Sequence, residues 1–385
     1  MRRCLTIIQN RPTQFDIPLY ARMWDSGEWD LQVLYTAADD LAATDAELGR
    51  APQWDHVAAL ANHAVYLSAA ERGNLKGLVD RIVAHRPQLV ILSGYYPRLH
   101  ARLVGPLKRR GLRIGLRSDN TLPHGDFSGL KGAAKRLLLP FWLARYDCWH
   151  PVGSLARDYL QTLSWRQRPV FPFPYAVDVE WFERQSAKVG AERDEQRARL
   201  GFAPGDFVVL GIMKWHPRED PLTLLRAFSR LFEHHRNARL LLIGAGPLSE
   251  AVTQAASAIG TAVVLPGYQP YSQLPLFYAI SDVFVHPSID EPWGVSVQEA
   301  LACGLPVLTA TGVGARFDLL QDGVTGWVFP NGDDATLAQR LGQLAEDDAL
   351  LASMRGAAGT QARKMDYAYT LAQFGAAIED LSHRN

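Results

Sequence analysis

The fold is decided by residues 281–333, which read SDVFVHPSIDEPWGVSVQEALACGLPVLTATGVGARFDLLQDGVTGWVFPNGD. Within them, Val283–His286 is a short apolar run bounded by turn residues, which is typical of a buried strand. Pro292 and Gly294 predict a tight turn, and a helix is expected from about Val295. The stretch therefore predicts a strand–turn–helix unit of an α/β domain.

The start of the expected helix is suited to a bound anion. Its first backbone N–H groups have no partner within the helix, and their partial positive charge attracts phosphate or sugar oxygens. Glu291 precedes the helix and Glu299 lies inside its second turn, so two carboxylates can flank one ligand. Carboxylates form strong, orienting hydrogen bonds to the hydroxyls of a sugar or a ribose.

The same alternation of apolar runs and helical patterns extends through the chain. Strands are expected at 5–8, 31–35, 89–92, 113–116, 148–150, 170–171, 207–213, 239–243, 262–265, 283–286, 306–309 and 326–329. Helices are expected at 57–71, 75–85, 134–144, 221–234, 249–259, 272–280, 295–302, 335–346 and 367–383. Strands that are apolar throughout and separated by helices predict parallel sheets covered on both faces.

A chain of 385 residues exceeds the usual size of one domain, so two domains are expected. We place the first at residues 1–172 and the second at 173–365, with a C-terminal helix at 366–385 that packs back toward the first. The boundary region combines the turn-rich PFPYAVDVEWF with AERDEQRARLGF, which is interpreted as a charged, solvated helix or linker. Ligands of such sheets bind outside the carboxyl ends of the strands, which predicts a site in a cleft between the domains.

The composition restricts the class of protein. No apolar run approaches the roughly 18 residues of a membrane span, and the one near the N-terminus is too short for a signal peptide. Cys4, Cys148 and Cys303 are scattered, so neither a disulfide framework nor a zinc site is expected, and a reducing cytoplasm fits. Residues 1–180 hold 23 Lys and Arg against 17 Asp and Glu, which indicates either an anionic partner or ordinary surface variation.

Several segments carry a resemblance to a known family. The pair Glu291–x7–Glu299, with PWG after the first Glu and EALACGLPV around the second, looks like the retaining glycosyltransferases of family 4, which have the GT-B architecture. Further segments that resemble the family are YQPYSQLPLFYAISDVFVHPS, VGARFDLLQDGVTGWVFPNGD, PYAVDVEWF, LLIGAGPL and IIQNRPTQFDIPLYARM. They occur in the family's order over most of the chain, whereas an isolated E–x7–E pair is weak evidence.

The resemblance implies an α/β fold of the GT-B type, with two Rossmann-like domains whose parallel sheets face across a cleft. It implies transfer of a hexosyl group from a nucleoside diphosphate sugar, UDP- or GDP-linked, to the hydroxyl of a glycan, lipid-linked or small-molecule acceptor. Retention of configuration, no metal and no cofactor are expected. Glu299 would bind the ribose and Glu291 the donor sugar, while Trp293, Gly294 and Val295 would present backbone amides to sugar and phosphate.

The leaving diphosphate needs fixed positive groups. The family has an Arg or Lys after the first strand of the donor domain and a Lys five residues later; here these positions are Lys214 and Glu219. A carboxylate at the second position would repel phosphate. Either Arg218 takes the role with its forked guanidinium, or the enzyme is slow, or catalysis has been lost.

The remaining donor-side candidates lie in loops. Gly244 and Gly246 in GAGP suit a close approach of backbone to ligand, and the lack of GxGxxG argues against a nicotinamide cofactor. Tyr268 either contacts the base or packs in the core. The amides of residues 312–314 and the side chain of Arg316 are candidates for contact with the diphosphate.

The N-terminal half is expected to bind the acceptor. Gln14 and Asp16 follow the first strand, so they are candidates for residues facing the acceptor. Arg117 and Asp119 end a central strand; Arg117 can meet a phosphate or an anionic acceptor, and Asp119 can act as a base or orient a hydroxyl.

The segment LKGAAKRLLLPFWLARY, residues 130–146, interleaves basic and apolar residues. It suits a helix that lies on an anionic membrane, although a core-packed helix broken at Pro140 is the commoner structure for such a pattern. We expect a cytoplasmic protein with no nucleic-acid partner, with peripheral contact at the inner face of the membrane as the open alternative.

Other functions remain open on the same architecture. They are a nucleotide-sugar epimerase, a glycosyl phosphorylase, and a catalytically weakened nucleotide-binding homologue, the last being motivated by Glu219. Asp39–Asp40 and Asp333–Asp334 look like loop pairs rather than a metal-binding DxD motif, in line with metal independence.

Overall fold

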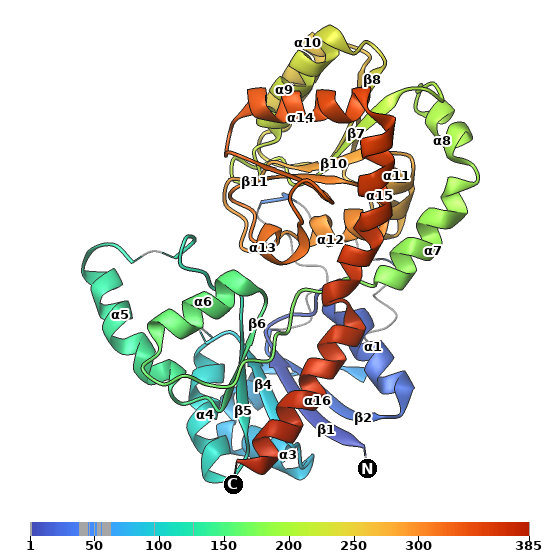
Figure 1. The fold of residues 1–385 in the computed structure, drawn as a ribbon. Helices are drawn as coiled ribbons and strands as arrows, with labels where there is room; N and C mark the ends of the chain where they lie inside the picture. The colour runs from blue at the N-terminus through green and yellow to red at the C-terminus, as the bar shows by residue number, and fades with distance from the viewer. Residues whose placement is uncertain are drawn as a thin grey trace. The chain divides into compact units, whose positions relative to one another are not determined.

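The computed structural model describes residues 2–37, 45, 47–49, 51, 55, 63–95, 97–125 and 127–384. The chain divides into two compact units, the first formed by residues 1–42, 57–176 and 367–385 and the second by residues 43–56 and 177–366 (Figure 1). Asp45 and Glu47, which were expected in the first domain, belong to the second unit, where both pair with Lys214.

The described part of the first unit contains a parallel sheet in the order β3-β2-β1-β4-β5-β6. Its strands are β1 Arg3–Gln9, β2 Trp29–Tyr35, β3 Val65–Tyr66, β4 Leu89–Ser93, β5 Ile114–Ser118 and β6 Cys148–Pro151. Its helices are α1 Asp16–Ser26, α2 Ala69–Gly73, α3 Leu75–Ala84, α4 Arg98–Arg109, α5 Gly129–Leu143, α6 Ser154–Leu163 and α16 Tyr367–His383. This strand order is that of a Rossmann sheet, whose direction of winding reverses between β1 and β4.

The second unit repeats this topology in the order β12-β11-β10-β7-β8-β9. Its strands are β7 Phe207–Ile212, β8 Ala238–Ile243, β9 Val263–Gly267, β10 Val283–His286, β11 Val307–Ala310 and β12 Gly326–Phe329. Its α-helices are α7 Val179–Gly190, α8 Arg193–Arg199, α9 Pro221–His234, α10 Ser249–Ile259, α11 Leu274–Ala279, α12 Val295–Ala302, α13 Arg316–Leu319, α14 Asp334–Glu346 and α15 Asp348–Ala362. Short 3₁₀ turns occupy Tyr271–Gln273 and Arg363–Met365. The winding of this sheet reverses between β7 and β10.

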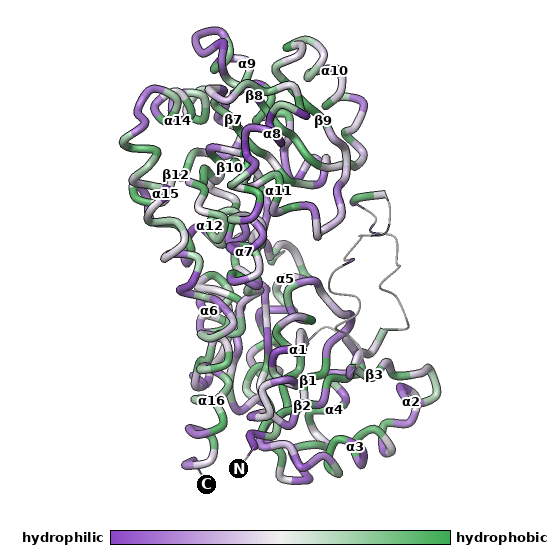
Figure 2. Tube along the Cα trace, turned by 90° about the vertical axis from the view of Figure 1, so that its right-hand side faces the viewer, coloured by the Kyte–Doolittle hydropathy of each residue, from purple (hydrophilic) through white to green (hydrophobic). Residues whose placement is uncertain are grey.

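The sheets are buried on both faces, as their continuously apolar strands require. Val208, Val209 and Leu210 of β7 are fully buried although successive side chains point to opposite faces. The apolar residues can be followed along the chain trace in Figure 2.

The C-terminal helix α16 belongs to the first unit. Its residues Phe374, Ala377 and Ile378 are buried in one cluster with Leu5 and Ile7 of β1, and Figure 1 shows the helix beside that sheet. This packing explains why the last residues of the chain group with the first ones.

Three local expectations are wrong. The helix expected at 57–71 is replaced at its described end by β3 and α2, while residues 57–62 lie outside the described part. The strand expected at 170–171 is only a bridge between Val170 and Trp149. The charged segment 191–202 is not solvated throughout, because Arg197 is buried and its guanidinium donates to Asp282 and to the carbonyl of Ile280.

No helix in the described ranges combines the length and the apolar character that crossing a bilayer would require.

Candidate functional site

Charged side chains gather at the reversal point of the second sheet. Lys214 and Arg218 lie in the loop after β7, and Glu291 lies in the loop after the neighbouring strand β10. Because the strands are parallel, both loops leave from the carboxyl edge of the sheet. In open α/β sheets this is where ligands bind.

Arg218 is the centre of this cluster. Its Nη1 donates to Glu291 Oε2 and to the carbonyl of Asp290, both at 2.7 Å. Its Nη2 donates to Glu47 Oε2 at 3.0 Å and to Glu219 Oε1 at 3.2 Å. Burial opposes the charge, but these carboxylates outweigh it and raise the pKa of Arg218 above its ordinary value. The guanidinium is therefore a permanently charged group that keeps 23% of its side-chain surface exposed.

Lys214 shares one of these carboxylates. Its Nζ lies 2.8 Å from Glu47 Oε2 and 2.9 Å from Asp45 Oδ2, and its side chain is 30% exposed. Hydrogen bonds from Arg218 and Lys214 lower the pKa of Glu47 to about 2. Two cations thus converge on one anionic oxygen acceptor. Sequence reasoning missed Asp45 and Glu47, which no local motif marks.

Glu219, expected to repel a phosphate, is buried inside the loop instead. Its side chain is 8% exposed, and Oε2 accepts the backbone N–H of Lys214 at 2.8 Å. Burial, followed by the negative charge of Glu291, raises the pKa of Glu219 to about 7. The carboxyl therefore braces the Lys214–Arg218 loop and is partly neutral near pH 7.

The loop that carries Glu291 is held by the residues after β11. Gly314 N–H donates to the carbonyl of Glu291 at 2.8 Å, and Gly312 N–H donates to Asn331 Oδ1 at 2.7 Å. A Cβ on Gly314 would lie 2.0 Å from the carbonyl oxygen of Pro292. These amides hold the protein's own loops together in this structure. Their contact with a diphosphate stays a prediction.

The N-terminus of α12 has no side-chain cap. Its N-cap residue Gly294 has a φ of 100° and no side chain that could cap the helix. Trp293, just before it, is buried, and its carbonyl accepts the N–H of Ala315 at 2.8 Å. The helix begins at Val295, as the sequence indicated.

His286, the last residue of β10, is a polar group that sequence reasoning missed. Within the described part of the chain its buried Nε2 has no hydrogen-bond partner, and it lies 3.4 Å from the place of a Cβ on Gly294. Burial lowers the pKa of His286 to about 4, so the ring is neutral. A polar residue ending an apolar strand directly before a Pro-Ser turn is the signal that could have identified it.

Glu291 and Glu299 have different surroundings. Glu291 is 21% exposed and bonded to Arg218, whereas Glu299 is 3% exposed and accepts the hydroxyl of Tyr278 at 2.8 Å. Burial raises the pKa of Glu299 to about 7. The second carboxylate is thus enclosed by protein on α12 and engaged by a tyrosine hydroxyl.

The loop candidates contact protein groups. A Cβ on Gly244 would lie 1.9 Å from the carbonyl oxygen of Met213, and one on Gly246 would lie 2.7 Å from that of Trp215. These glycines therefore allow two loops of the second unit to pack closely. Tyr268 is half-buried. Arg316 donates from Nε to the carbonyl of Thr311 at 3.1 Å, and its guanidinium lies 3.9 Å from the centroid of the Phe317 ring.

In the first unit, Asp16 and Arg117 form a buried ion pair. Arg117 Nη1 donates to Asp16 Oδ2 at 2.8 Å, and its other nitrogens donate to the carbonyls of Phe173 and Pro174. Gln9 Nε2 donates to the same Asp16 oxygen at 3.1 Å. Each residue neutralises the other below the surface of the unit. Contact of either one with an acceptor stays a prediction.

The other two acceptor-side candidates are more accessible. Asp119 is exposed and accepts the hydroxyl of Tyr175 at 2.8 Å, while Gln14 is half-buried. Of the four residues expected on this side, only these two reach the surface of the unit.

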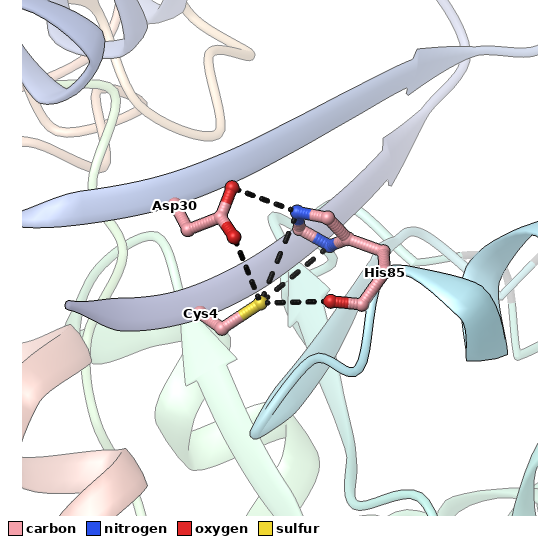
Figure 3. A group of neighbouring side chains, drawn as sticks. All are labelled: Cys4, Asp30 and His85. Atoms are coloured by element: carbon pink, nitrogen blue, oxygen red, sulfur yellow. Dashed lines mark hydrogen bonds and ion pairs between the residues drawn. The ribbon is translucent and has the colours of Figure 1, made fainter. Parts of the chain in front are cut away.

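Cys4, one of the three scattered cysteines, lies beside Asp30 and His85 (Figure 3). Its Sγ lies 3.9 Å from Asp30 Oδ2 and 3.7 Å from His85 Nδ1, and His85 Nε2 lies 3.2 Å from Asp30 Oδ1. The thiol also donates to the carbonyl of His85 at 3.2 Å, and Thr6 Oγ1 lies 2.9 Å from His85 Nδ1. The three side chains already satisfy one another, at the amino end of β1 and away from Asp119.

Comparison with known proteins finds a family match inside the second unit. Residues 192–365 match the family model described as "Glycosyl transferases group 1". The D-inositol 3-phosphate glycosyltransferase of Nocardia farcinica is 32% identical over 189 residues, which are 46% of this chain and 42% of that protein. A GDP-mannose-dependent alpha-(1-6)-phosphatidylinositol monomannoside mannosyltransferase of Mycolicibacterium smegmatis is 33% identical over 43% of this chain and 45% of that protein. The chain thus spans less than half the length of these relatives.

Solved structures resemble the whole chain. The Anabaena Alr3699/HepE structure with UDP and glucose has a TM-score of 0.72 at 16% identity, covering 98% of this chain and 100% of that one. The glycosyltransferase of Rickettsia africae has a TM-score of 0.77 at 13% identity and covers both chains completely. The fold is therefore GT-B, an α/β architecture of two Rossmann-like domains. More particularly, residues 192–365 of the second unit are similar to the glycosyl transferases of group 1.

Proposed function

We propose that this chain is a retaining glycosyltransferase of family 4 that moves a hexosyl group from a nucleoside diphosphate sugar to an acceptor hydroxyl. The observation that carries the proposal is the contact of Arg218 with Glu291 at 2.7 Å, beside Lys214 and the uncapped start of α12. A diphosphate leaving group needs such cations and helix-terminal amides, and a carboxylate accepts sugar hydroxyls. The UDP and glucose in the Anabaena structure and the group 1 domain match support a nucleotide-sugar donor, UDP- or GDP-linked.

Lys214 and Arg218 would hold the diphosphate. Both cations now share the carboxylate of Glu47, and a phosphate oxygen accepts the same N–H groups. Donor binding would therefore replace a protein carboxylate by a phosphate. Arg218 takes the role that the family gives to a lysine at the position of Glu219, and Arg316 would add a further cation.

The two glutamates would orient the donor from either end. Glu291 would accept hydroxyls of the sugar. Glu299 would accept the ribose diol, with Tyr278 held beside it. Trp293 and Val295 would contribute backbone amides at the start of α12.

The other donor contacts would be made by backbone. Gly244 and Gly246 would let the loop after β8 pass close to the nucleotide, and Tyr268 would lie beside the base.

The reaction would proceed on one face of the sugar. The bond between the anomeric carbon and the diphosphate oxygen breaks, and the acceptor oxygen bonds to the same face through an oxocarbenium-like transition state. The acceptor proton passes to the departing phosphate oxygen or to Asp119, and Gln14 helps to orient the acceptor. The site would act by positioning and charge neutralisation, without a metal or other cofactor.

The first experiment is a thermal-shift screen of the full chain with UDP, GDP and ADP. A ligand that binds the native state raises its stability, so the preferred nucleotide is expected to raise the melting temperature. Mass spectrometry of products then identifies sugar and linkage, and activity that survives EDTA supports metal independence. The proposed function is overturned if none of the nucleotides raises the melting temperature and no nucleotide sugar is consumed.

Glu299→Ala tests the ribose contact. We expect at least a roughly tenfold weaker nucleotide affinity, because a charge-assisted hydrogen-bond acceptor is lost. Glu299→Gln keeps the shape of the buried side chain and separates misfolding from loss of binding. Glu233→Ala, on an exposed position of α9, is the matched control. Unchanged affinity of Glu299→Ala for every nucleotide contradicts the assignment.

A further inference from the structure

The outer side of α5 carries a continuous apolar stripe. Residues 130, 133, 134, 137, 138, 141 and 142 are exposed and recur every three or four positions, so they share one side of the helix. The exposed fractions are 91% for Leu130, 64% for Leu137, 55% for Leu138, 54% for Phe141 and 37% for Trp142. Amphipathic helices of globular proteins normally turn this side toward the core. Here the buried residues lie elsewhere on the helix; they are Gly132, Leu139, Pro140 and Leu143.

A neighbouring aromatic residue extends the stripe. Trp165, just after α6, is 62% exposed, and its ring centroid lies 4.0 Å from that of Phe141. In Figure 1, α5 lies next to α6 at the periphery of the first unit. We call residues 130, 133, 134, 137, 138, 141, 142 and 165 the α5 patch. An apolar surface gathered in this way marks an interaction site.

The charged residues of the segment that carries α5 all have one sign. Residues 127–146 contain four Lys and Arg and no Asp or Glu. Lys131 and Arg136 are exposed on α5 itself, and Arg145 places its guanidinium 4.7 Å from the centroid of the Trp142 ring. Arg166 is exposed beside Trp165. The patch is therefore apolar at its centre and cationic at its border.

We propose that the α5 patch docks onto an anionic phospholipid bilayer. Its leucine and aromatic side chains would enter the boundary between headgroups and acyl chains, while Lys131, Arg136 and Arg166 would contact lipid phosphates. Helices that combine an apolar side with basic residues and tryptophan lie in this interface. α5 has 15 residues, about 22 Å at the rise of an α-helix, so it lies along the surface rather than across the bilayer.

Charge favours a bilayer over a second copy of the chain. In a twofold dimer the same patch faces itself, so the cationic borders of the two copies would meet with no acidic residue of the segment between them. An anionic bilayer neutralises all of these charges at once. One further step rests on the proposed function: the acceptor would then be a lipid-linked hydroxyl that is presented at the bilayer surface.

Flotation of the full chain with vesicles tests the proposal. We expect binding to phosphatidylcholine vesicles that contain about 30% phosphatidylglycerol, weaker binding to pure phosphatidylcholine, and loss of binding at high salt. The double variant Leu137→Gln/Leu138→Gln should bind at least about tenfold more weakly, because it removes two largely exposed apolar side chains. Lys131→Glu/Arg136→Glu should lower the affinity for anionic vesicles roughly fivefold for each positive charge removed. The negative charges that replace them should lower it further. Val324→Gln, exposed in the second unit, is the control.

Three results would overturn the proposal. They are no binding to anionic vesicles, equal binding of the wild type and the α5 variants, and a dimer in sedimentation velocity that Leu137→Gln/Leu138→Gln dissolves. The last result would assign the patch to a second copy of the chain. The nucleotide screen keeps the two proposals separate, because the α5 variants should retain the nucleotide-induced thermal shift and Glu299→Gln should retain vesicle binding.

Discussion

The two units use the same sheet topology but treat the charges at its reversal point differently. In the first, Arg117 is 4% exposed and its partner Asp16 is 3% exposed, and both are closed inside a network with Gln9. In the second, Lys214 and Arg218 keep 30% and 23% of their side-chain surface, and share Glu47 from a segment far away in the sequence.

The difference separates a structural cation from one that can exchange partners. Removing Asp16 from Arg117 would expose a charge to a low-dielectric interior, which is costly. Replacing Glu47 at Lys214 and Arg218 exchanges one anionic oxygen for another at a partly hydrated surface, which costs little. The buried pair of the first unit and the partly exposed cations of the second therefore differ in how easily their partners can be replaced.

The largest effect is expected where the cation is buried. Arg117→Met should destabilise the first unit by about 3–5 kcal/mol, because it leaves Asp16 charged and unpaired in the interior. Urea unfolding with hydrogen-exchange readout on β1 and β5 measures this. The double variant Asp16→Asn/Arg117→Met should recover much of the loss. A cost below about 1 kcal/mol for the single variant would remove the contrast between the units.

The second largest effect is expected at Arg218, the partly exposed cation of the second unit. Arg218→Ala should lower donor kcat/KM by about 10²–10³-fold, equivalent to roughly 2.7–4 kcal/mol, with a small effect on stability, because it removes charge stabilisation of the leaving group. Steady-state kinetics with the donor found in the nucleotide screen measures it. Arg226→Ala, an exposed arginine on α9, serves as the control. If stability falls and kinetics do not, Arg218 is structural like Arg117.

The pH dependence of Glu219 sharpens the comparison. Its carboxyl has a pKa of about 7 in the folded chain and about 4.5 when unfolded, so between these values the native state holds the extra proton. Stability therefore falls as pH rises from about 4.5 to 7, by on the order of 2 kcal/mol relative to Glu219→Gln. Urea midpoints of both proteins across this range measure the difference. Glu299 titrates in the same pH range in the wild type and in Glu219→Gln, so its contribution cancels in the difference between them. Parallel stability profiles of the two proteins would show that Glu219 ionises at its ordinary pKa.

The smallest effect concerns the shared carboxylate. Glu47→Gln should tighten nucleotide binding by about two- to fivefold, because an exposed pair worth roughly 0.2–1 kcal/mol no longer competes with the phosphate. Isothermal titration of the nucleotide found in the screen measures this. Glu71→Gln, an acidic residue paired with Arg81 in the first unit, is the matched control. Weaker binding in Glu47→Gln would indicate that Glu47 contacts the ligand itself.

Local patterns were most reliable where one segment decides its own structure. The helices at 221–234, 249–259, 295–302 and 367–383 and the strands at 283–286 and 326–329 have the expected bounds. The clearest case is α9, where Asp220 is the N-cap and Pro221 is the first residue of the helix. β3 was missed because two residues at a sheet edge carry too short a pattern.

The sequence by itself determined the α/β class, the strand–turn–helix unit around Glu291, and the presence of Lys214 and Arg218 after β7, since these depend on apolar period and residue order. Only the tertiary structure decided which charges are neutralised and which surface is covered. It buried Arg117 against Asp16, paired Lys214 with Glu47, and left the apolar stripe of α5 exposed. Partners distant in the chain and burial both set these properties, and neither is written in a local pattern.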